Sequence, residues 1–135
     1  MTTKIYPLQF TPILKDRIWG GTKLSTVLDK SITSDNVGES WEISTVEGDV
    51  SVVSNGALAG NTLDEIINSD PEAILGTTVY KQFGKQFPLL FKYLDADKDL
   101  SIQVHPNDEL AKKNHDSFGK TEMWYVIQAD QSARI

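Results

Sequence analysis

A glutamine and a histidine stand two residues apart in a short segment of alternating character. Residues 100–106 read Leu-Ser-Ile-Gln-Val-His-Pro, and this alternation predicts a strand whose apolar face packs on a core. Gln103 and His105 share the polar face, so an amide oxygen and an imidazole nitrogen are presented to the same small volume. A second strand-like run, 122–127, begins at Glu122.

Pairing of these two predicted strands in one sheet brings together an amide oxygen, an imidazole nitrogen and a carboxylate. Gln103, His105 and Glu122 then suit a divalent metal ion of borderline hardness, with zinc as the first choice and iron or manganese after it. The alternative is a solvated glutamine and a surface histidine, because glutamine is an uncommon ligand and short motifs match by chance. From the residues alone both interpretations stay open.

Two lysines are further candidates for a functional role. Lys120 precedes Glu122 by two residues, so on a continuing strand both share one face. Lys92 interrupts an otherwise apolar predicted strand, 87–94. The alternative for each lysine is a surface side chain whose apolar stem lies along the protein.

The predicted strand 37–44 places a charge among apolar neighbours. Glu39, Trp41 and Ile43 share one face by alternation. Burial of this glutamate is costly unless it is paired or lines a polar cavity. The alternative is a half-buried strand end with Glu39 in water, and the sequence does not decide between the two.

A small helical insert is predicted near residues 62–76. Thr62 and Glu65 form a capping box, and Asp70 followed by Pro71 begins a second helix that Gly76 ends. The remaining short strands predict a mainly β chain dominated by an antiparallel sheet. No linker, repeat or low-complexity segment divides the chain, so one domain over residues 1–135 is expected.

Composition excludes several classes of partner. The net charge of −6 argues against a nucleic-acid surface, although a few local lysines can still hold one phosphate. No run approaches the length of a membrane span, and the first residues lack the apolar core of a signal peptide. The absence of cysteine excludes thiolate ligands and disulfides. The cytoplasm is the expected location.

Several motifs together resemble the type I phosphomannose isomerases. These are zinc enzymes of the cupin superfamily that interconvert mannose 6-phosphate and fructose 6-phosphate. Each motif is weakly specific alone, but their order and spacing match the family along nearly the whole chain. The motifs are Trp19–Gly21, Gly38–Ser44, Phe87–Lys92, Leu100–Pro106 and Gly119–Tyr125.

The resemblance implies a fold, a reaction and roles for single residues. It implies a cupin-type jelly roll, a sugar phosphate substrate, and zinc held by Gln103, His105 and Glu122. It gives Lys120 and Lys92 substrate-binding or catalytic roles, in a reaction in which a base moves a carbon-bound proton and a metal stabilises the enediolate. The general base is not assigned.

The chain departs from the family in one ligand and in length. The family uses a second histidine, whereas the only other histidine here, His115, lies in a charged stretch typical of a solvated helix face. Family members are more than twice this length, so we expect the front portion of an isomerase. Its jelly roll is then incomplete at the C-terminal side, inactive alone, and prone to self-association through open sheet edges.

Two other classes of protein remain as alternatives. One is a cupin module that binds metal or sugar without catalysis. The other is a different cupin metalloenzyme, such as an iron dioxygenase, which a site with two histidines favours. The single matching histidine, His105, beside a glutamine argues against the dioxygenase.

Overall fold

The computed structural model of the protein describes residues 5–134. They belong to two compact units, Met1–Leu100 and Ser101–Ile135. Within the described part of the chain no helix is both long enough and apolar enough to cross a membrane. The expectation of a single domain over residues 1–135 stays a prediction.

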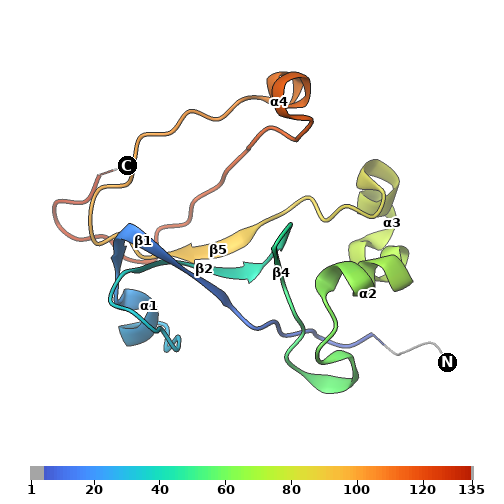
Figure 1. Ribbon diagram of the computed structural model, residues 1–135, viewed down its shortest axis with the longest axis horizontal. Helices are drawn as coiled ribbons and strands as arrows, with labels where there is room; N and C mark the ends of the chain where they lie inside the picture. The colour runs from blue at the N-terminus through green and yellow to red at the C-terminus, as the bar shows by residue number, and fades with distance from the viewer. Residues whose placement is uncertain (1–4, 135) are drawn as a thin grey trace. The chain divides into compact units, whose positions relative to one another are not determined.

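The first unit is built on a three-stranded antiparallel sheet. Its strands are β1 (Ile13–Gly21), β2 (Val37–Ile43) and β5 (Phe91–Leu94), and β2 is the central one. Figure 1 shows β2 and β5 side by side, with β1 across β2. The strand predicted over 37–44 is thus confirmed, while the strand predicted over 87–94 is shorter than expected.

Short elements connect the strands. Helix α1 (Lys23–Thr26) follows β1, and its first backbone N–H is bound by the buried Asp95 carboxylate at 2.6 Å. A two-stranded hairpin of β3 (Thr45–Val46) and β4 (Asp49–Val50) follows β2. Its turn contains Gly48 at a φ of 82°, a conformation that favours glycine.

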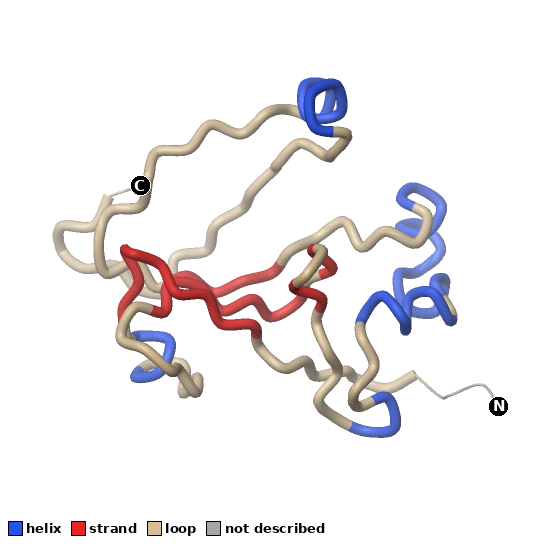
Figure 2. Tube along the Cα trace, in the orientation of Figure 1, coloured by secondary structure: helices blue, strands red, loops and turns tan. Residues whose placement is uncertain are grey.

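The helical insert begins where the caps predict. A short 3-10 turn, η1 (Gly56–Leu58), precedes α2 (Leu63–Ser69), and Thr62 and Glu65 form both hydrogen bonds of the capping box. Helix α3 (Pro71–Phe83) begins at its N-cap Asp70. The chain leaves helical geometry at Gly76, where φ is 78°, but then resumes the helix. The insert is therefore longer than predicted. Its helices α2 and α3 are labelled in Figure 1 and are among those drawn in blue in Figure 2.

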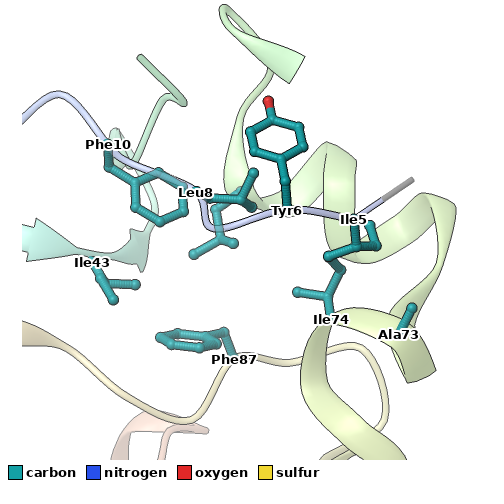
Figure 3. A pocket seen from close by; sticks show the side chains of 9 residues that line it. Ile5, Tyr6, Leu8, Phe10, Ile43, Ala73, Ile74 and Phe87 are labelled. Carbon is teal, nitrogen blue, oxygen red and sulfur yellow. The ribbon is translucent and has the colours of Figure 1, made fainter. Parts of the chain in front are cut away.

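An apolar groove separates the insert from the end of the sheet. It is lined by the N-terminal segment, the end of β2, both helices of the insert and the loop before β5. In Figure 3 the side chains of Phe10, Ile43, Ile74 and Phe87 point toward it. Leu63, Ile66 and Ile67 of α2 are buried, and Leu63 also lines the groove.

The second unit holds helix α4 (Asp108–His115) between two extended arms, residues 101–106 and 120–127. Neither the strand predicted over 100–106 nor the one predicted over 122–127 forms, so both predictions are wrong. Ile102 and Val104 are 99% and 93% exposed, so no core covers the predicted apolar face. A strand needs a neighbouring strand to pair with, and in the described residues neither segment is part of a sheet.

We propose that the isolated chain self-associates through these arms, because exposed extended segments rich in apolar residues pair readily with another chain. Light scattering after gel filtration at several concentrations should show mass above one chain. The double variant Ile102→Glu with Met123→Glu, both more than nine-tenths exposed, should shift the mass toward a monomer.

The matched control is Ile18→Glu, since Ile18 is 92% exposed on β1 in the first unit. It should leave the association unchanged. A wild-type chain that stays monomeric at high concentration contradicts this proposal.

Candidate functional site

Three of the residues singled out in the sequence lie together in the second unit. His105 Nε2 is 3.6 Å from Glu122 Oε2, and Lys120 Nζ is 2.9 Å from Glu122 Oε1 and 3.3 Å from His105 Nε2. They come from the two arms that flank α4. The backbone N–H of Lys120 donates to the Pro106 carbonyl at 3.3 Å and so connects the two arms. The arms therefore bring His105, Lys120 and Glu122 together without forming a sheet.

Gln103 and His115 lie in different surroundings. Gln103 donates from Nε2 to Ser101 Oγ at 3.2 Å, a contact with a near neighbour on its own arm. His115 is exposed at the end of α4. Among the residues that the structure describes, no three His, Cys, Asp or Glu side chains form a metal-binding group. Any metal held here therefore needs an amide oxygen, water or substrate beside His105 and Glu122.

The distance between His105 and Glu122 allows both side chains to bind the same metal ion. Two ligands of a tetrahedral zinc lie roughly 3.3 Å apart, given bonds of about 2.0–2.1 Å, and the observed separation is 3.6 Å. A lysine ammonium can only donate, so its contact with His105 Nε2 is a hydrogen bond in the tautomer that carries its proton on Nδ1 and a lone pair on Nε2. The same lone pair is the one that a metal binds, which makes the residues present chemically compatible with zinc.

A second polar cluster lies on one face of the sheet in the first unit. We call it the charged face, and it consists of Lys15, Arg17, Glu39, Trp41 and Lys92. Glu39 is only 6% exposed, yet it is paired: Oε1 accepts from Lys92 Nζ at 2.8 Å, and Oε2 accepts from an Arg17 guanidinium nitrogen at 2.6 Å. Trp41 Nε1 also donates to Oε2, at 3.0 Å. The structure thus decides for a buried, paired Glu39 rather than one in water.

Strand register explains why these side chains meet. Trp41 on β2 is opposite Lys92 on β5, and Glu39 is opposite Lys15 on β1. Lys15 pairs with Asp49, and its Nζ lies 5.1 Å from the centre of the Trp41 ring. Because the Lys92 ammonium is hydrogen-bonded to Glu39, Lys92 is not a free surface lysine.

Arg17 is the member of the cluster that sequence reasoning missed. It follows Lys15 by two residues, so alternation on β1 puts both lysine and arginine on one face. That spacing was the available signal, but the pairing of β1 with β2 is needed to connect it to Glu39.

The opposite face of β2 holds a separate ion pair. Both Glu42 oxygens accept from Lys30 Nζ at 2.8 Å, and Ser40 Oγ donates to Glu42 at 2.6 Å. Lys30 Nζ also lies 5.4 Å from the centre of the Tyr93 ring. Glu39 and Glu42 therefore serve different sides of the same strand.

The charged face keeps Glu39 ionised. Burial raises the pKa of the Glu39 carboxyl, but the hydrogen bonds from Lys92 and Trp41 and the positive charges of Lys92 and Arg17 outweigh it. The pKa of Glu39 therefore lies below its ordinary value of 4.5. On the surface, the Lys112 ammonium likewise lowers the pKa of Asp116.

A family model described as phosphomannose isomerase type I, catalytic domain, matches residues 7–126. The chain is 45% identical over 131 residues to the probable mannose-6-phosphate isomerase GmuF of Bacillus subtilis, a match that covers 96% of this chain and 40% of that protein. It is 44% identical over 137 residues to the Bacillus subtilis mannose-6-phosphate isomerase ManA, covering 100% and 41% respectively. The chain thus spans about two fifths of the length of these curated relatives.

Solved structures give the same result. The crystal structure of the mannose 6-phosphate isomerase from Bacillus subtilis aligns with a TM-score of 0.75 at 40% identity, over 84% of this chain and 35% of that one. A zinc-bound crystal structure of a mannose 6-phosphate isomerase aligns with a TM-score of 0.66 at 26% identity, over 78% and 27%. The predicted fold class is confirmed: antiparallel sheets that are open, with no closed barrel in the described residues.

Replacement of Glu39 by glutamine should destabilise the first unit at neutral pH by about 1–3 kcal/mol, because a buried hydrogen-bonded group loses its partners. Because the pKa of Glu39 is lower in the folded chain than in the unfolded chain, its contribution to stability decreases as the pH falls. Ionised Glu39 contributes stability that is fully present above the pKa of the unfolded chain, and this stability is lost as pH falls through the lower folded-state pKa. The difference between wild type and Glu39→Gln should therefore shrink below about pH 4, as measured by urea unfolding.

The control for this measurement is Asp116→Asn. Its pair with Lys112 is exposed, so its removal should leave the free energy of unfolding unchanged within error. A Glu39→Gln chain as stable as wild type at neutral pH shows that the cluster does not stabilise the sheet.

Proposed function

We propose, because the chain belongs to the type I phosphomannose isomerase family, that it forms the front part of a mannose-6-phosphate isomerase. Such an enzyme interconverts mannose 6-phosphate and fructose 6-phosphate, an aldose–ketose isomerisation. The observation that carries the proposal is the approach of His105, Lys120 and Glu122 within the residues that match the family.

The metal-binding part of the proposal assigns zinc to Gln103, His105 and Glu122. When bound there, zinc supplies positive charge that stabilises the oxygens of an enediolate. His105 offers Nε2, Glu122 offers a carboxylate, and Gln103 must turn its side-chain amide, whose Nε2 donates to Ser101 Oγ, until the amide oxygen faces them. A zinc-bound relative among the solved structures supports this choice of metal.

The two lysines are assigned to the substrate. Lys120 already shares its charge with Glu122 and His105, so in our proposal it binds or protonates a sugar oxygen beside the metal. Lys92 belongs to the charged face, where Arg17 and Lys92 surround the Glu39 carboxylate and the third cation, Lys15, pairs with Asp49. That local excess of positive charge favours an anionic sugar phosphate.

The cytoplasm is the proposed location of the protein, in keeping with a metabolic reaction on a phosphorylated sugar. We propose neither nucleic acid nor membrane as a partner, since the net charge is −6 and the described residues hold no membrane-spanning helix.

Zinc binding tests the metal site. Isothermal titration of the metal-free chain with zinc should show one site, and His105→Ala or Glu122→Ala should weaken it at least about tenfold, since each removes a ligand. His115→Ala is the matched control and should bind zinc as wild type does, because His115 is exposed on α4. Equal affinity of wild type and His105→Ala contradicts the proposed site.

Activity tests the reaction itself. The isolated chain should isomerise mannose 6-phosphate far more slowly than a full-length relative. A chimera in which this chain replaces the matching two fifths of the ManA protein should be active, because both halves of the fold are then present. In that chimera Lys120→Ala should lower kcat about a hundredfold, a typical loss for a residue in proton transfer.

Lys112→Ala is the control for the chimera, since Lys112 is an exposed lysine on α4. It should leave kcat unchanged. A chimera that binds zinc but shows no turnover supports a binding module instead of an isomerase.

A further inference from the structure

We propose that Glu39 is the positioning residue for Lys92, holding the Lys92 ammonium at one place on the charged face. This inference rests on the proposed function, in which Lys92 meets the sugar phosphate. It assigns Glu39 an effect that reaches the substrate only through Lys92, and it assigns Arg17 and Trp41 the task of fixing Glu39.

The two oxygens of Glu39 have separate partners. Oε1 accepts from Lys92 at 2.8 Å, whereas Oε2 accepts from Arg17 at 2.6 Å and from Trp41 at 3.0 Å. The carboxylate is thus anchored through one oxygen by β1 and β2 and holds the lysine of β5 through the other. A fixed carboxylate confines a lysine that otherwise has many rotamers.

A positioning role requires that Glu39 be more buried than the lysine that it holds, and the exposed fractions of the two side chains agree with this. The Glu39 side chain is 8% exposed and the Lys92 side chain is 23% exposed. The anchor is therefore enclosed, while the held lysine retains access to solvent and to a small ligand.

Neither glutamine nor aspartate can hold Lys92 and also accept from Arg17 and Trp41. Glutamine has one oxygen and one NH₂ group, so it presents a donor either to Lys92 or to the Arg17 and Trp41 donors. Aspartate is one methylene shorter and cannot keep all three contacts at hydrogen-bond distance. The requirement for glutamate thus follows from the three donors that surround it.

The experiment follows the Lys92 side chain by NMR in the full 135-residue chain. In wild type the Lys92 ammonium should give a protected ¹H–¹⁵N cross-peak and inequivalent ε-methylene protons. Glu39→Gln should abolish both. Glu42→Gln, which removes a charge from the other face of β2, should leave both intact.

The readout separates positioning from a purely structural role. A structural role for Glu39 lowers the stability of the variant but leaves the Lys92 signals of the folded chain in place. Unchanged Lys92 signals in folded Glu39→Gln therefore overturn the proposal.

A second measurement needs no variant and covers the case in which Glu39→Gln does not fold. Acid titration of the wild type protonates Glu39, whose charged neighbours are Lys15 and Arg17 from β1 and Lys92 from β5. The Lys92 and Trp41 indole signals should then move with one common midpoint. Movement of Trp41 without Lys92 overturns the proposal.

Mannose 6-phosphate distinguishes this inference from the proposed function. Its addition should shift the Lys92 cross-peak in wild type and Glu42→Gln, with affinity lost at least about tenfold in Glu39→Gln, as expected for one charged hydrogen bond. A wild type that shows no shift counts against the proposed function alone, because the coupling of Lys92 to Glu39 is measured without sugar.

Discussion

The sheet of the first unit depends on one buried carboxylate. Glu39 lies on the central strand and is held from both sides, by Arg17 of β1 and Lys92 of β5. A buried charge without partners is very costly, so the three strands must keep the register that supplies both cations. The contacts that keep the strands in register are also those that hold the lysine, so the stability of the sheet and the proposed ligand binding depend on the same side chains.

The second unit is organised differently. His105, Lys120 and Glu122 meet on extended arms, and their side chains are 27%, 44% and 33% exposed. Charged contacts at such exposure contribute little stability, and no sheet in the described residues fixes the arms. The arrangement therefore suits a site that its ligand orders, because metal bonds contribute free energy that the protein contacts do not.

Local signals explain what the sequence predicted well. The caps at Thr62 and Asp70 act over three residues, so both helix starts were predictable. The cost of burying Glu39 made paired burial one of two open interpretations, and the structure shows that one. Non-local pairing explains the failures. The alternation over 100–106 predicts a strand, but alternation does not supply a neighbouring strand to pair with. Likewise Arg17 lies 22 residues before Glu39, and only the register of β1 with β2 joins them. Gly76 reads as a stop, yet a single residue at positive φ lets the helix resume.

Charge shows why an acidic chain can still suit an anionic ligand. The net charge of −6 describes the whole sequence, and it governs solubility and repulsion of polyanions such as nucleic acids. Binding of one phosphate depends on the few charges within a Debye length of about 8–10 Å. On the charged face, Lys15 pairs with Asp49 while Arg17 and Lys92 share the Glu39 carboxylate, and together these charges leave a local excess of one positive charge. The Glu39 carboxylate lowers this excess of positive charge and so weakens the attraction for an anionic ligand. The same carboxylate fixes the positions of Arg17 and Lys92.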